Sequence, residues 1–140
     1  MSHLHDEERG GYMGKSALLF IIIFLVLGIA IIDGGSILFG RLQLQDIADA
    51  ASSEAASEYK KSSNPQQALA AAETIVAERD PTVKIIVEKN NPKSFAVDPQ
   101  TGIVTLTVEK DAHTLFIGKI GPLKSFAHLE TTSRQAPPTL

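Results

Sequence analysis

Cysteine is absent from the 140 residues of the chain, which excludes disulfide bonds and thiolate metal sites. This absence leaves the redox compartment open, because many exported domains fold without disulfides. A basic excess is also lacking: the formal net charge is −3, so we expect no nucleic-acid partner. Proline is missing from Lys15 to Asn64, so no proline interrupts a helix there.

Charge is absent from the apolar run Ala17 to Ile32, which as a helix would span about 24 Å. Small or apolar residues continue this run to Gly40, broken by Asp33. A chain of this size cannot easily surround a helix that is apolar on every face. We therefore predict a transmembrane helix over residues 15–40, with Lys15 and Arg41 near the two membrane surfaces. The residues expected at the anchor and its interfaces are Lys15, Gly28, Ala30, Asp33, Gly34, Gly35, Gly40 and Arg41.

A nucleotide-binding loop and a cleaved signal peptide are two alternatives for this N-terminal region. The letters Gly14-Lys15-Ser16 resemble the end of a phosphate-binding loop, but the first glycine of that motif should stand at position 9, which is Arg9. A cleaved signal peptide could end at Gly28-Ile29-Ala30, yet the apolar run continues past this triplet. We favour an uncleaved anchor. Lysine and arginine near its N-terminal end favour a cytoplasmic N-terminus and an exported C-terminal part.

After the anchor, small and apolar residues recur at three- and four-residue spacings, which predicts a helix with one alanine-rich face. We expect this face to pack within its own domain rather than against a partner. Its predicted packing residues are Leu44, Ile47, Ala48, Ala51 and Ala55. Asn64-Pro65 predicts a break and a second helix, which Asp80-Pro81 ends.

The period then changes to that of β-strands. Residues 82–89, 93–97, 103–110 and 114–120 are predicted strands, and 124–134 a predicted edge strand. The two helices should cover the sheet face that carries Ile85, Val87, Val104, Leu106 and Val108. The expected fold is α+β: a long helix that is transmembrane and then solvent-exposed, a second helix and a small antiparallel sheet. The expected segments are a disordered cytoplasmic tail (1–14), a transmembrane helix (15–40), an exported helix-helix-sheet domain (41–132) and a flexible tail (133–140).

Polar residues give little sign of chemistry. His3 and His5 with Asp6 offer metal ligands, but in a short tail that would have to be ordered. Neither His113 nor His128 has further ligands at a metal-binding spacing, and no nucleophile elbow or paired-acid motif is present. We expect no catalysis, no cofactor and no metal.

The stretch ALLFIIIFLVLGIAIIDGGSILFGRLQLQDIADAASSEAA, Ala17 to Ala56, combines an apolar segment, Asp-Gly-Gly, Arg-Leu-Gln and Asp-x-Ala-Asp-Ala-Ala. This order resembles the N-terminal region of TadG-like proteins of the tight-adherence (Flp pilus) system. The matching positions are Asp33, Gly34, Arg41, Leu42, Gln43, Asp46, Asp49 and Ala50.

The resemblance implies a non-enzymatic, single-pass protein of the cytoplasmic membrane in a pilus-assembly or secretion apparatus. Its implied partners are the lipid bilayer, other assembly proteins and further copies of itself. Pilins of this system are cleaved after a glycine, with Glu at the fifth mature position, and no Glu stands five residues after Gly10, Gly11 or Gly14. We therefore predict an unprocessed chain. A pilin-like filament subunit and a tethered binding module remain the alternatives.

Overall fold

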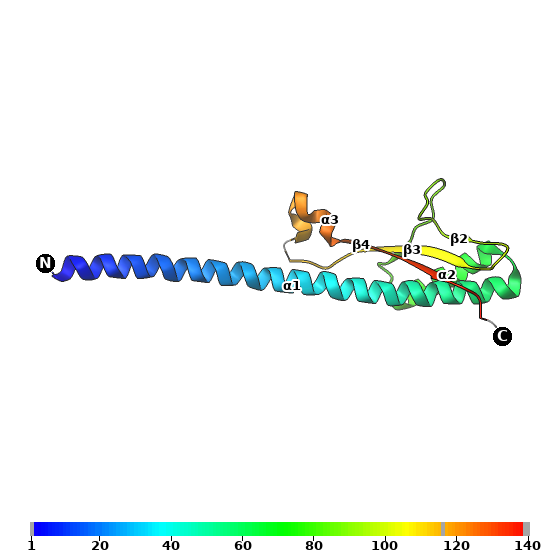
Figure 1. Ribbon diagram of the computed structural model, residues 1–140, viewed down its shortest axis with the longest axis horizontal. Helices are drawn as coiled ribbons and strands as arrows, with labels where there is room; N and C mark the ends of the chain where they lie inside the picture. The colour runs from blue at the N-terminus through cyan, green and yellow to red at the C-terminus, as the bar shows by residue number, and fades with distance from the viewer. Residues whose placement is uncertain (1, 116, 139–140) are drawn as a thin grey trace.

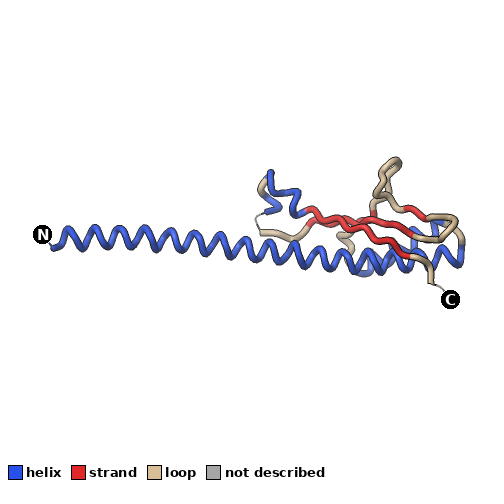
Figure 2. Tube along the Cα trace, in the orientation of Figure 1, coloured by secondary structure: helices blue, strands red, loops and turns tan. Residues whose placement is uncertain are grey.

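The structure, a computed structural model, describes residues 2–115 and 117–138, with side chains described from Gly14 onward. It confirms the α+β class. Helix α1 (Ser2–Ser62) is followed by α2 (Pro65–Arg79) and then by a small antiparallel sheet with short helical turns before its last strand. The first half of α1 extends alone, and every other element lies along its second half (Figure 1; Figure 2).

Helix α1 is longer than the sequence analysis predicts. The sequence predicts a disordered tail over residues 1–14 and a helix that begins at residue 15. Residue 1 lies outside the described residues, and from Ser2 onward the backbone is helical without a break. The physical reason is that this stretch has no proline, so an established apolar helix propagates into it one residue at a time.

Helix α2 begins and ends as predicted. The Asn64 side chain accepts a hydrogen bond from the backbone N–H of Gln66 at 2.9 Å, and Pro65 occupies the first turn. After the helix, the Asp80 carboxylate accepts a hydrogen bond from Lys110 Nζ at 2.7 Å. This bond, with a second from Thr82, lowers the pKa of Asp80 to about 2. The end of α2 is thereby fixed to the sheet.

Strand β3 (Val104–Asp111) is the centre of the sheet. Along one edge it pairs with β4 (His128–Gln135) over its whole length, in the register Val104 to Gln135. Along its other edge it pairs with two short strands, β1 (Lys84–Ile85) near its end and β2 (Ala96–Val97) near its start. All pairings are antiparallel.

The core lies between the second half of α1, α2 and one face of the sheet. Val104, Leu106 and Val108 are fully buried on that face, as predicted. Val87 is 53% exposed, which corrects the prediction that it joins this face. The reason is that the strand ends at Ile85, so the chain has already left the sheet at Val87.

Three further segments differ from expectation. The predicted strand 114–120 is instead a turn leading into a 3-10 helix, η1 (Ile117–Lys119), followed by η2 (Gly121–Leu123) and the short helix α3 (Lys124–Ala127). The predicted edge strand starts later, at His128, and is the main partner of β3. It continues to Gln135, which shortens the predicted tail 133–140, whose residues 139–140 lie outside the described residues.

Candidate functional site

From Gly14 to Ile32 the residues of α1 are exposed or half-buried, and we call this part the bare half of α1. From Leu18 to Leu27 its large apolar side chains are exposed, Phe24 at 73%. Among the described residues, one helix is long and apolar enough to cross a membrane, judged by length and composition. Contiguous apolar surface of this size marks contact with lipid or with another protein. The surface is therefore the candidate functional site of the chain.

The small residues predicted for the anchor lie on the open part of this helix. Ala30, Gly34 and Gly35 are exposed, and Gly28 is half-buried. A Cβ atom added at Gly28, Gly34 or Gly35 would meet nothing within 4 Å outside the helix. Lys15 is exposed at the start of the apolar run. These glycines thus leave room on the helix surface that no described part of the chain fills.

Asp33, one of the residues expected at the anchor and its interfaces, has its partners within the chain. It is fully buried, and its carboxylate accepts hydrogen bonds from the backbone N–H groups of Leu115 at 2.7 Å and Ile117 at 2.9 Å. Hydrogen bonds from backbone amides stabilise a carboxylate that has lost contact with water. Asp33 therefore ties the start of η1 to the apolar half of α1.

Strand β4 contacts α1 near the end of the predicted span. Gly40 is buried, and a Cβ at this position would lie 2.8 Å from Leu129 Cδ1, so a larger residue here would require the Leu129 side chain to shift. Arg41 is exposed beside an open hollow of about 490 Å³ between α1 and β4. Its lining residues are Arg41, Leu42, Gln45, His128, Leu129, Glu130 and Thr131.

The alanine-rich face of α1 lies inside the domain. All five of its predicted packing residues are buried, with at most 2% of any of them exposed. Alanine side chains are short, so the sheet and α2 can both approach the α1 backbone closely. The structure places this face against α2, β3 and β4 rather than leaving it open.

Two further aspartates of α1 also bind elements of the domain. Asp46 forms an ion pair with Arg79 of α2 at 2.8 Å. Asp49 accepts a hydrogen bond from the hydroxyl of Ser133 in β4 at 2.7 Å, and Ser133 also pairs with the buried Ser52 at 2.9 Å. With Asp33, three aspartates of α1 thus reach three different elements. The sequence analysis missed Ser133 and Ser52, because isolated serines carry no local signal of their partners.

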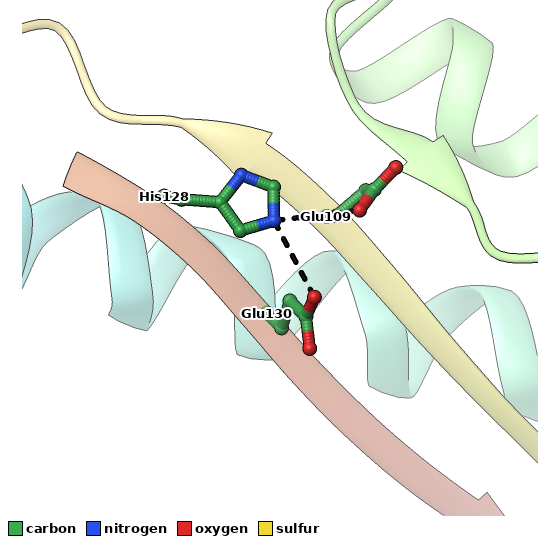
Figure 3. A group of neighbouring side chains, drawn as sticks. All are labelled: Glu109, His128 and Glu130. Carbon is green, nitrogen blue, oxygen red and sulfur yellow. Dashed lines mark ion pairs between the residues drawn. The ribbon is translucent and has the colours of Figure 1, made fainter. Parts of the chain in front are cut away.

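A cluster of polar side chains that the sequence did not predict lies on the outer face of the β3–β4 pair (Figure 3). Glu109 and Glu130 stand opposite each other in the register, where two like charges repel. His128 Nε2 lies 3.4 Å from each of these carboxylates, and its Nδ1 lies 2.9 Å from Asp111 Oδ1. Imidazole and carboxylates are zinc ligand types, so the three residues Glu109, His128 and Glu130 could hold such an ion.

Protonation of His128 places a positive charge beside the carboxylates of Glu109, Glu130 and Asp111. The hydrogen bond to Asp111, above all, raises the pKa of His128, and Glu130 and Glu109 act in the same direction. Lys93 pairs with Glu130 at 2.6 Å, and this hydrogen bond lowers the pKa of Glu130. Ion pairs with His128 and Lys93 are therefore enough to explain why these carboxylates lie together, and the cluster gives no evidence of a function.

The variant Asp111→Asn is expected to lower the pKa of His128 towards the ordinary value of about 6.5, because the carboxylate that favours the imidazolium is removed. An NMR titration of the full chain in micelles measures this. Asp46→Asn, on another element, should leave the His128 pKa unchanged. Because folding raises this pKa, the ion pairs stabilise the fold fully below the unfolded pKa of about 6.5, and this contribution is lost as pH rises through the folded value. An unchanged pKa in Asp111→Asn would contradict the assignment.

The fold and the bare helix define a class: a protein with one candidate membrane span joined without a linker to a small α+β domain. Residues 11–58 match the family described as Tad, putative Flp pilus-assembly TadE/G-like. The resemblance seen in the sequence is thereby confirmed for this segment, and residues 59–140 lie outside the match. No curated protein and no solved structure matches the chain.

Proposed function

We propose that the chain is a non-enzymatic, membrane-anchored component of a Tad/Flp-type pilus-assembly or secretion apparatus. The observation that supports this proposal is that one family match includes both the apolar part of α1 and the part that packs in the domain. The family match at residues 11–58 covers the bare apolar half of α1 together with the part that packs under the sheet. A segment of this kind both enters a membrane and carries a domain. Asp33, Asp46 and Asp49 are engaged in contacts within the chain, and these contacts support a structural role for them.

The proposed orientation places the N-terminus in the cytoplasm and the sheet domain outside the cytoplasmic membrane. Arg9 and Lys15 flank the N-terminal side of the apolar run, and Arg41 stands closest on the other side. Lysine and arginine are enriched on the cytoplasmic side of membrane helices, so the bias favours this orientation. In this arrangement the sheet domain is available to other assembly proteins or to further copies of the chain.

A pilin-like filament subunit is the second candidate, and the bare half of α1 is the observation that favours it. A helix that projects from a small sheet domain can pack with other copies in a filament core as well as in lipid. Such a subunit would have to leave the membrane after cleavage. The missing Glu five residues after each candidate glycine argues against that processing.

Cysteine labelling in intact cells tests the proposal, because the chain has no cysteine of its own. Two single variants, Ser2→Cys and Gln100→Cys, place a thiol at each end of the expected topology. Gln100 lies exposed in the turn between β2 and β3, whereas Ser133 is buried and would report poorly. We expect a membrane-impermeant maleimide to label position 100 but not position 2, at full-length mass and in the membrane fraction.

Other labelling patterns oppose the proposal in distinct ways. Labelling at position 2 but not at 100 would reverse the orientation. Labelling at 100 on a shortened chain that appears in sheared filaments would establish the pilin-like alternative. Recovery of the unlabelled chain in the soluble fraction would remove the membrane anchor altogether.

A further inference from the structure

The place where the sheet domain meets α1 lies close to a membrane boundary if α1 is the anchor, and this inference rests on the proposed function. At about 1.5 Å per residue, the helix rises about 27 Å from Lys15 to Asp33. A hydrocarbon core is about 30 Å thick. If Lys15 lies at one boundary of the hydrocarbon core, Asp33 lies near the opposite boundary. This is the depth at which the lipid acyl chains meet the headgroups.

The segment held at this depth is η1, η2 and α3. Asp33 binds the backbone N–H groups of Leu115 and Ile117, so the start of this segment is fixed against α1. Figure 1 shows η1, η2 and α3 (orange) beside the middle of α1, at the end of the sheet domain nearest the bare helix. If α1 is the anchor, this segment is the part of the described domain that lies nearest the bilayer.

The outer surface of this segment is apolar and basic. Four large apolar side chains are exposed, Leu115 at 56%, Phe126 at 58%, and Ile120 and Leu123 at 38% each. Lys119 and Lys124 lie among them, and both are exposed. We call these six residues the η–α3 patch. From Ala112 to Ala127 the sequence contains no Asp or Glu, so no acidic side chain of the segment opposes an anionic surface.

We propose that the η–α3 patch is a second membrane contact, which lies in the headgroup region of the bilayer that α1 spans and binds anionic phospholipid. Leu115, Ile120, Leu123 and Phe126 enter the outer edge of the hydrocarbon, and Lys119 and Lys124 extend to lipid phosphates. This division between apolar and cationic side chains is that of interfacial membrane segments. The buried Asp33 anchors the patch at the correct depth, so its carboxylate binds backbone amides where it would otherwise face lipid.

Tryptophan fluorescence tests the proposal, because the chain has no native tryptophan. The full chain is reconstituted in phosphatidylcholine vesicles with and without phosphatidylglycerol, with bromine or doxyl quenchers at a shallow or a deep acyl position. Three single variants are compared. Phe126→Trp reports the patch, Phe24→Trp reports the apolar half of α1, and Val87→Trp is the matched exposed control. Val87 is 53% exposed and belongs to the connection between β1 and β2, which Figure 1 shows apart from η1, η2 and α3.

We expect blue-shifted emission from Phe126→Trp that shallow quenchers reduce more than deep ones, with a larger effect when phosphatidylglycerol is present. In the same vesicles Phe24→Trp should be reduced most by the deep quencher, and Val87→Trp by neither. Replacing both Lys119 and Lys124 with Gln should abolish the added effect of phosphatidylglycerol on Phe126→Trp.

The outcomes separate this inference from the proposed function. Quenching of Phe24→Trp without quenching of Phe126→Trp would overturn the second contact and leave the anchor in place. Absence of quenching from both would overturn the anchor and the inference together. A blue shift of Phe126→Trp that grows with protein density but is insensitive to lipid quenchers would identify a second copy as the occupant and overturn the lipid proposal. Quenching equal with and without phosphatidylglycerol would overturn the role of the lysines.

Discussion

Asp33→Asn is expected to release the start of η1 from α1 while the rest of the domain stays folded. The asparagine keeps the size of the side chain but removes the charge and one of the two acceptor oxygens, so one partly buried N–H, at Leu115 or Ile117, loses its acceptor. Leaving such a group unsatisfied costs about 1–3 kcal/mol. Hydrogen exchange at these two amides should therefore accelerate on the order of 30-fold, which corresponds to about 2 kcal/mol.

Asp46→Asn is the matched control for this variant. Asp46 also belongs to α1 and pairs with Arg79, but its side chain is 73% exposed. Exposed ion pairs contribute little, so we expect less than about 1 kcal/mol and no change in exchange at Leu115 or Ile117. If exchange at these amides is the same in Asp33→Asn as in the wild type, Asp33 does not hold the segment.

Leu106→Ala is expected to be the most destabilising single change in the core. Leu106 is fully buried in the middle of β3, in the cluster that the sheet shares with both helices. Truncating a buried leucine to alanine costs about 2–5 kcal/mol, because the lost contacts leave a cavity. The alanine side chains of α1 that share this core have no length with which to fill the space. Pulse proteolysis of the full chain in micelles across a urea series should show a clearly lowered midpoint.

Val87→Ala provides the comparison for Leu106→Ala. Val87 is 53% exposed and lies outside the strand, so its truncation should change the free energy of unfolding by less than about 0.5 kcal/mol. Equal midpoints for the two variants would contradict the arrangement in which α1 and α2 cover the sheet through β3.

The parts of the fold that sequence reasoning predicted depend on local patterns. Asn64-Pro65 is a cap and first-turn pair, and the structure has the cap hydrogen bond that this pair predicts. Val104, Leu106 and Val108 alternate with threonine and glutamate, and these three valine and leucine residues are the buried face of β3. The alanine spacing along α1 likewise follows the helical period, and those residues lie in the core.

The parts that it did not predict depend on contacts between residues far apart in sequence. Residues 114–120 have the composition of a strand, but Asp33 binds the amides at Leu115 and Ile117, and η1 follows. Strand β4 is mostly polar, and Ser133 is buried because Asp49 and Ser52 of α1 provide its hydrogen bonds. No window around either segment contains these partners, so a local pattern could not predict them.

The unbroken course of α1 has a mechanical consequence. The helix runs from Ser2 to Ser62 with no hinge, and Asp33, Asp46 and Asp49 fasten its second half to three different elements of the domain. If the apolar half of α1 is the membrane anchor, a tilt of that half in the bilayer would rotate the sheet domain, which lies along the other half of the same helix of about 90 Å, through the same angle. A force on the domain would likewise be transmitted along the helix to the half that is proposed to lie in lipid.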